Sequence, residues 1–253
     1  MSKGIYKILR DDNAKNPNPW SLTDEKAVQI SFQLKAPLLC RHCEQERISR
    51  NGENWVLANC LKKDGTFPLA SVLASTPPDV SLSTTPTRVH YAARIPEIDR
   101  SALAYFAASI FWRGSIHPWN RDGSVPIKLG PFQESFRKYL MGQGDFPTDC
   151  ALLVTVREGK EIDRLTYAPV GERREIFHVY KFPMPGLAFS MVVSKNIPAN
   201  FREKCFVRGP GNPIITTPII EKWLLQDAVQ LREKQLWLAG NDRRSSERVA
   251  RSR

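Results

Sequence analysis

The sequence predicts an α+β protein, and three features of its 253 residues support this fold class. Residues 27–34 alternate apolar and polar side chains and lead into a Cys-x-x-Cys pair, which indicates an N-terminal region of strand, knuckle and helix. The middle of the chain holds two segments with apolar residues at helical spacing. Apolar, β-branched runs at residues 151–156, 177–182 and 187–193 predict an antiparallel sheet, and a long C-terminal helix is expected over residues 218–238.

The first unit, residues 1–63, is expected to be a zinc-knuckle-like region. Residues 44–50 favour helix, and the Asn-Gly pair at residues 51–52 is expected to break or turn it. Apolar positions then recur at helical spacing and predict a second helix over residues 53–61. The following residues, 64–86, are rich in Pro, Ser and Thr, which indicates a loop or linker and an internal boundary.

The main α+β domain is expected over residues 87–240. It begins with a strand predicted at residues 88–95. Asp99 is then placed to cap a helix, because an Asp side chain can accept a hydrogen bond from the first helical N–H groups. The apolar residues of that helix form one broad stripe: Leu103, Phe106, Ala107, Ile110 and Phe111. A second amphipathic helix is predicted over residues 132–141.

Shorter elements complete the second half. The Pro-Met-Pro-Gly segment at residues 183–186 predicts a turn between two strands of the sheet. A short helix is expected at residues 198–205 and a short extended piece at residues 213–216. Residues 241–253 contain five arginines and no periodicity, which predicts a disordered basic tail.

The charge balance points to an anionic partner. The chain has 37 Lys and Arg against 26 Asp and Glu, a formal net charge of +11 and a pI near 9.6. Such a surface attracts polyanions and accelerates their encounter without giving sequence specificity. Nucleic acid is therefore a candidate partner, and simple solubility is the alternative explanation of the same charge.

Composition also predicts the compartment. The longest apolar runs, at residues 102–112 and 151–156, fall short of the roughly 20 residues that cross a bilayer. The first residues lack the apolar core of a secretory signal. The five cysteines are an odd number without a disulfide pattern, which suits a reducing compartment. We therefore expect a cytoplasmic protein with no membrane partner.

The Cys-x-x-Cys pair, Cys40 and Cys43, allows three interpretations. Two thiolates at this spacing can hold one edge of a tetrahedral zinc ion, which needs four ligands. The sequence has no second such pair, and the candidates to complete the set are Cys60, His42 and His90. A dithiol redox role also suits the spacing, although no βαβ pattern surrounds it. The third interpretation is a knuckle that lacks the rest of a metal site and carries two reduced thiols.

Residues 38–44 (LLCRHCE) and 52–56 (GENWV) resemble a family of uncharacterised bacterial proteins with an HNH-like, treble-clef zinc knuckle. Residues 2–7 are similar to the family's helix after a Ser-His segment, and residues 110–113 to a later Trp-Arg segment. The family's first Cys-x-x-Cys and its Ser-His-Ile-Ile-Pro segment have no counterpart in this chain. The resemblance therefore implies zinc with an incomplete ligand set, in a truncated or degenerate member.

Three arginines accompany the knuckle: Arg41, Arg47 and Arg50. The helices of related treble-clef nucleases contact phosphates, so the resemblance implies that these side chains bind nucleic acid. Arginines spaced along a solvated helix are equally ordinary, so a purely structural role is the alternative.

A nuclease of this type activates water with a histidine and stabilises the leaving oxygen with a divalent metal. The sequence offers His117, which could lie near Glu44 or Glu53, or could be a satisfied surface or core histidine. Arg113 is either the partner in a buried ion pair or a ligand clamp. The catalytic residues are therefore left unassigned.

The function predicted from these features is an HNH-like zinc-knuckle protein that binds nucleic acid. If it is an enzyme, it would be a metal-dependent, endonuclease-like hydrolase, and the missing histidine segment indicates that activity is lost. A non-enzymatic protein-interaction module with a structural knuckle is the alternative. A thiol redox protein is the third hypothesis.

Overall fold

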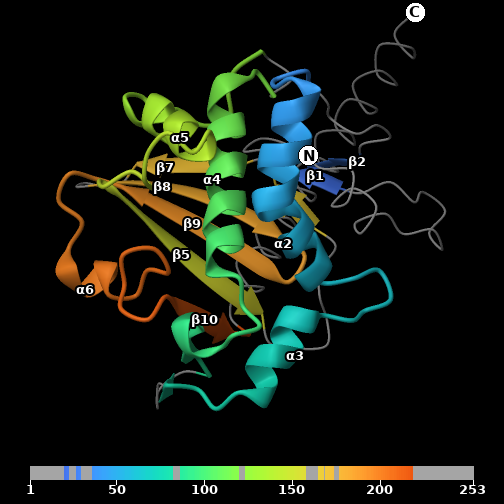
Figure 1. Cartoon of the computed structure of the whole chain (residues 1–253), viewed down its shortest axis with the longest axis vertical. Helices are drawn as coiled ribbons and strands as arrows, with labels where there is room; N and C mark the ends of the chain where they lie inside the picture. Colours follow the sequence, from blue (N-terminus) through green and yellow to red (C-terminus); the bar gives the residue numbers. More distant parts are fainter. Residues whose placement is uncertain are drawn as a thin grey trace, which may run out of the picture.

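A seven-stranded sheet with its longest helices packed on one face is the frame of the molecule (Figure 1). It confirms the α+β class. The computed structural model describes residues 20–22, 27–29, 36–81, 86–119, 123–157, 165–167, 169–173 and 177–218. The predicted final helix from residue 219 onward, the basic tail and the first 19 residues lie outside the described residues.

The sheet has the order β3-β4-β10-β5-β9-β8-β7. Its strands are β3 (Val80–Ser81), β4 (Arg88–Tyr91), β5 (Cys150–Arg157), β7 (Val170–Arg173), β8 (His178–Met184), β9 (Leu187–Val193) and β10 (Pro213–Thr217). Within this sheet β10 and β5 pair in parallel, and the other neighbours are antiparallel. The predicted antiparallel trio is therefore confirmed as β5, β9 and β8.

The predicted turn between β8 and β9 is confirmed but is shorter than residues 183–186, because Pro183 and Met184 belong to β8. Pro185 and Gly186 connect the paired residues Met184 and Leu187. Gly186 has a φ of +76°, which glycine adopts without a steric penalty. A β-carbon there would also lie 2.4 Å from the ring of Phe67, so the turn admits only glycine.

A second, three-stranded sheet has the order β2-β1-β6, formed by β1 (Trp20–Leu22), β2 (Ala27–Gln29) and β6 (Leu165–Tyr167). The strand predicted over residues 27–34 is thus found at its start, and its remainder lies outside the described residues. β1 pairs antiparallel with β2 and parallel with β6, so distant parts of the chain share this sheet.

The central helix is α4 (Arg100–Ile116), and its predicted cap is confirmed. The Asp99 carboxylate accepts a hydrogen bond from the N–H of Ala102 at 2.9 Å. The expected single apolar stripe is wrong, because every residue from position 102 to 112 is buried. The physical reason is its position: α4 runs across one face of the sheet, and a second long helix lies alongside it (Figure 1).

That second helix runs without interruption from residue 41 to residue 59. It consists of one opening turn, the π-helical segment η1 (Cys43–Glu53) and α2 (Asn54–Asn59). The predicted break at the Asn-Gly pair is therefore wrong. Gly52 is needed for close packing instead, since a β-carbon at this position would lie 2.8 Å from the backbone nitrogen of Phe106 on α4.

Residues 64–86 contain more structure than the predicted loop or linker. Helix α3 (Pro68–Ser75) begins with proline at its first position, where the missing N–H costs nothing. Leu69 and Leu73 are each 2% exposed and belong to the same core as the sheet. Within the described residues this segment is therefore packed against the rest of the protein.

The remaining helices follow the predictions. They are α5 (Phe132–Leu140) and the short α6 (Ala199–Arg202). In α5, Phe136 and Leu140 are buried. The expected strand at residues 88–95 is shorter than predicted, because the 3₁₀ turn η2 (Ala92–Arg94) follows β4.

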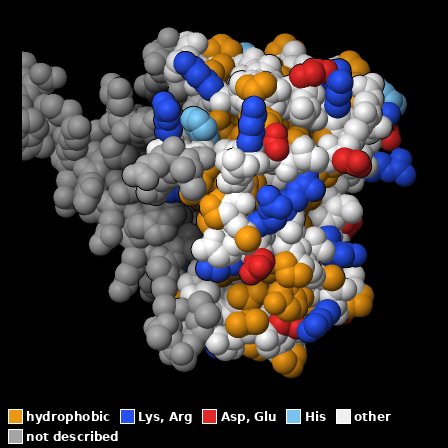
Figure 2. All heavy atoms as spheres, turned by 90° about the vertical axis from the view of Figure 1, so that its left-hand side faces the viewer, with side chains coloured by type: hydrophobic (Ala, Val, Ile, Leu, Met, Phe, Trp, Pro, Cys, Tyr) orange, Lys and Arg blue, Asp and Glu red, His pale blue; other side chains and the backbone are white. Residues whose placement is uncertain are grey.

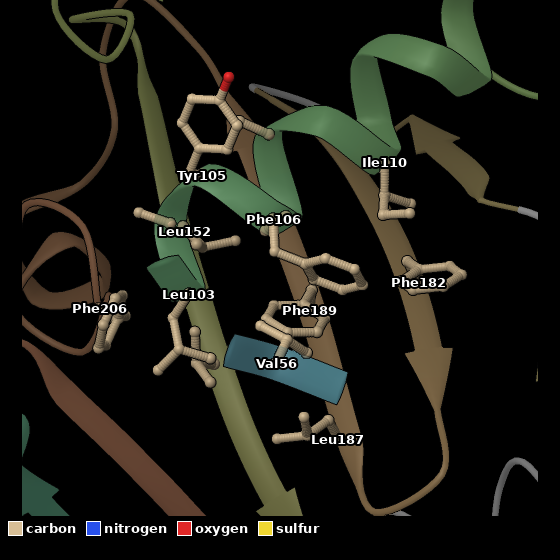
Figure 3. Close-up of a cluster of buried hydrophobic side chains, with 14 of the residues drawn as sticks. Val56, Leu103, Tyr105, Phe106, Ile110, Leu152, Phe182, Leu187, Phe189 and Phe206 are labelled. Carbon is tan, nitrogen blue, oxygen red and sulfur yellow. The ribbon is translucent and has the colours of Figure 1, made fainter. Parts of the chain in front are cut away.

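Two buried clusters stabilise the sheet from opposite faces. The larger one fills the space between the helices and the sheet, with Phe106 pointing toward Phe182 and Phe189 (Figure 3). The smaller one includes Ala151 and Val192, which alternate along their strands with residues of the larger cluster and so face the other side. None of the described helices is both long and apolar enough to cross a membrane.

Candidate metal centre

The Cys-x-x-Cys pair lies at the start of the long helix. The carbonyl of Cys40 accepts the first helical hydrogen bond, from Glu44 N–H at 3.0 Å. Its Sγ accepts the N–H of Cys43 at 3.4 Å. Cys40 therefore occupies the cap position, with sulfur in the role that a Ser or Asp oxygen usually has.

Both thiols are accessible, and their pKa values differ in direction. Cys40 is exposed and Cys43 is half-buried. Hydrogen bonds from Cys43, first from its backbone N–H, lower the pKa of Cys40. The hydrogen bond with the Cys40 thiol raises the pKa of Cys43. The helix start thus holds one thiol whose pKa is lowered next to one whose pKa is raised.

The residues proposed to complete the ligand set do not join this pair. Cys60 lies beyond the other end of the helix, roughly 25 Å away at about 1.5 Å of rise per residue. His90 is buried in β4, within the sheet. His42 lies between the cysteines and is exposed. Across the described residues, which include every cysteine and histidine of the chain, no group of three or more potential ligands is placed to hold a metal.

The other cysteines are core residues. Cys60 is fully buried, its thiol lies within 4 Å of the carbonyls of Leu57 and Leu61, and burial raises its pKa to about 11. Burial also raises the pKa of Cys150 and of Cys205 to about 12. These three sulfurs remain thiols at neutral pH and do not compete for a metal.

The C-terminal end of α4 lies against the start of η1. Arg113 Nη1 is 3.2 Å from Glu44 Oε1, and the Arg113 side chain is only 15% exposed. The same guanidinium donates to the carbonyl and hydroxyl oxygens of Ser109. The ion-pair interpretation of Arg113 is therefore confirmed, and the pair fixes the carboxylate next to Cys43 in space.

His117 caps the end of α4 at the same corner. Its ring packs edge-on against Trp119 with a centroid distance of 4.4 Å. Trp119 Nε1 donates to the carbonyl of Arg113 at 2.8 Å. Glu53 was the other suggested neighbour of His117. It is buried and lies nine positions beyond Glu44 on the long helix. We therefore assign His117 no role as a base.

The three arginines near the pair differ in their contacts. Arg47 Nη1 donates to the carbonyl of Met141 at 3.1 Å, just after α5. Arg50 forms an exposed i,i+4 pair with Glu46 at 3.4 Å, and 76% of its side chain is exposed. Arg41 is exposed, in the first turn of the helix. Arg41 and Arg50 are thus more available to a ligand than Arg47.

One contact of Arg47 is not apparent in the sequence. The end of α5 is held by Arg47 through Met141 and by the Tyr105 hydroxyl, which donates to the carbonyl of Leu140 at 2.6 Å. Carbonyls at a helix C-terminus lack intrahelical partners, so both donors stabilise it. No local pattern links residues so far apart, and only the tertiary packing reveals the contact.

The chain matches no family model, no curated protein and no solved structure at a significant level. Its function must therefore be inferred from the geometry of its own residues.

Proposed function

We propose that the Cys40–Cys43 helix start holds a zinc ion and that the arginines beside it bind nucleic acid. The observation that carries the metal proposal is the open dithiol itself: an exposed sulfur and a half-exposed one at the same helix start. The Cys43 N–H donates to the Cys40 sulfur, a bond that also favours a coordinating thiolate.

The donors present fit a thiolate-preferring metal at two of its four positions. Zinc binds Cys sulfur at about 2.3 Å and completes a tetrahedron with other ligands. Cys40 and Cys43 would hold the ion, and the bound metal would fix the helix start as a structural centre. Among the described residues, no third potential ligand joins the pair. The other two coordination positions of the zinc ion are therefore open to water or to groups from another molecule.

The electrostatics favour an anionic polymer as partner. Lys and Arg side chains recur over the face shown in Figure 2, with acidic side chains between them. Together with the net charge of +11, this distribution favours attraction to phosphates over reading of bases. Near the metal site, Arg41 and Arg50 supply the most accessible guanidinium groups.

Metal content tests the first half of the proposal. We expect about one zinc per chain at neutral pH, because the two sulfurs are adjacent and accessible. Replacing either sulfur, by Cys40→Ser or Cys43→Ser, is expected to lower zinc affinity at least tenfold, measured by competition with a chromophoric chelator. Cys205→Ala is the matched control: it removes a buried thiol from another part of the fold and should leave zinc affinity unchanged. Equal zinc affinity in all four proteins would contradict the site.

Salt dependence of DNA binding tests the second half. Binding to duplex DNA should weaken steeply as salt rises, since neutralised phosphates release counterions. Arg41→Gln and Arg50→Gln should each reduce the slope of log K against log salt by about one. Arg137→Gln removes the same charge from the exposed face of α5, where Arg137 pairs with Glu134, and serves as control.

The pattern of slopes decides between local contact and overall charge. A smaller slope for the two helix variants than for Arg137→Gln supports phosphate contacts beside the cysteines. If all three variants behave alike, the attraction is diffuse. No DNA binding at low salt, with zinc bound, would leave the knuckle as part of a protein-interaction module.

A further inference from the structure

We infer that Cys40 and Cys43 form a thiol–disulfide exchange site that takes anionic small-molecule disulfides such as glutathione disulfide. This activity is separate from the metal proposal, since it belongs to the chain with no metal bound. It follows from the position of the two sulfurs, from the contrast with the other cysteines and from the charge beside the pair.

The spacing of the pair allows ring closure. Residues three apart on a helix have Cβ atoms about 5–6 Å apart, whereas a disulfide needs a Cβ separation of about 3.5–4.5 Å. The required approach is therefore about 1–2 Å. Cys40 is the cap residue, and its own N–H lies outside the helical hydrogen bonds. Only the bond from Glu44 N–H to its carbonyl ties it to the helix, so a small movement is allowed. The Cys43 N–H already donates to the Cys40 sulfur at 3.4 Å, so this sulfur lies against the first turn that carries Cys43.

Accessibility makes the site selective. Cys40 is exposed and is the sulfur that a disulfide in solution reaches first. Cys43 is half-buried behind it and is placed to resolve the intermediate. The other three cysteines, Cys60, Cys150 and Cys205, are each 0% exposed and are shielded in the folded protein.

Charge selects the substrate class. Arg41 lies between the two cysteines and is exposed, and Arg47 lies one turn beyond Cys43. Positive charge beside the attacking sulfur raises the local concentration of anions. Anionic disulfides are therefore preferred to neutral ones of similar size.

The exchange proceeds in two balanced steps. The Cys40 thiolate attacks one sulfur of glutathione disulfide, its S–S bond breaks, and one glutathione thiolate leaves. The Cys43 thiolate then attacks Cys40 in the mixed disulfide and displaces the second glutathione. The protein loses two electrons and two protons to form the Cys40–Cys43 disulfide, and glutathione disulfide is reduced to two thiols.

The test uses the full chain, freed of metal with a chelator and incubated with glutathione disulfide. Mass spectrometry of the alkylated, digested protein should show a Cys40–Cys43 disulfide and alkylated thiols at the three buried cysteines. Cys43→Ser should accumulate glutathione on Cys40, because the resolving thiol is absent. Circular dichroism shows whether this variant is folded, and the wild-type peptide map gives the answer independently.

Substrate choice is tested with a neutral disulfide, hydroxyethyl disulfide. The wild type should react several-fold faster with glutathione disulfide, and Arg41→Gln should reduce that ratio. Absence of the Cys40–Cys43 disulfide after incubation would overturn the inference, as would modification of the buried cysteines at an equal rate. A chain that binds zinc but forms no disulfide refutes the exchange site alone, and a chain that forms the disulfide but binds no zinc refutes the metal site alone.

Discussion

Replacing Phe106 with alanine is expected to lower the free energy of unfolding by about 4 kcal/mol. Phe106 is 0% exposed and lies where α4 meets the sheet. Its ring centroid lies 5.6 Å from that of Phe189 and 6.5 Å from that of Phe182 (Figure 3). The truncation removes these contacts and leaves a cavity that the two flanking secondary-structure layers cannot readily fill.

Urea unfolding followed by circular dichroism measures this loss. Phe201→Ala is the matched control, because Phe201 is half-buried and packs on Phe177 in the smaller cluster. We expect the control to lose less than half as much stability. Equal losses for the two variants would contradict the placement of Phe106 at the centre of the larger core.

Gly52→Ala is expected to destabilise the protein by about 3 kcal/mol. A β-carbon at this position would lie 2.8 Å from the Phe106 nitrogen and 3.1 Å from the Ala102 carbonyl oxygen. Both atoms belong to the backbone of α4, so the helices must move apart to relieve the contact. Intrinsic helix propensity alone predicts the opposite sign, a gain of about 1 kcal/mol for alanine.

The sign of the change in unfolding free energy therefore shows whether helix packing or helix propensity dominates at Gly52. Gly144→Ala is the control: Gly144 lies in an exposed loop after α5, and its added β-carbon would meet only the side chain of Lys138, at 3.8 Å. Alanine lowers the entropy of the unfolded chain, so Gly144→Ala should change the free energy of unfolding by no more than about 1 kcal/mol. The change should be stabilising if alanine fits the backbone conformation at this position. A Gly52→Ala variant as stable as the wild type would contradict the close helix crossing.

Local patterns in the sequence predicted those elements that depend on local physics. The β-branched runs became strands of the sheet, Asp99 capped the helix that follows it, and Pro185-Gly186 formed the predicted turn. In each case the signal lies within a few neighbouring residues. The fold class followed from the same features.

The errors arose where tertiary packing overrides a local signal. Gly52 follows Asn51 and resembles a turn, but the close approach of α4 requires glycine inside a continuous helix. The Pro, Ser and Thr content of residues 64–86 obscured α3, whose apolar residues pack into the core. The parallel pairing of β10 with β5 joins segments 60 positions apart in register, for which no local pattern exists.

The candidate site was predictable in part. The spacing of Cys40 and Cys43 predicted two neighbouring sulfurs, and both residues lie at the same helix start. The sequence left Arg113 either an ion-pair partner or a ligand clamp, and the structure shows the ion pair, with Glu44 as a partner that the sequence did not indicate. Proximity along the chain suggested Cys60 as a ligand, but the length of the intervening helix carries it away from the pair.

The most direct test of the proposed metal centre is X-ray absorption at the zinc edge of the purified, zinc-loaded chain. We predict two sulfur neighbours at about 2.3 Å together with nitrogen or oxygen neighbours that complete the coordination. Cys40→Ser should reduce the sulfur count by one. A zinc ion surrounded by nitrogen and oxygen atoms alone would show adventitious binding and would contradict the assignment of Cys40 and Cys43 as ligands.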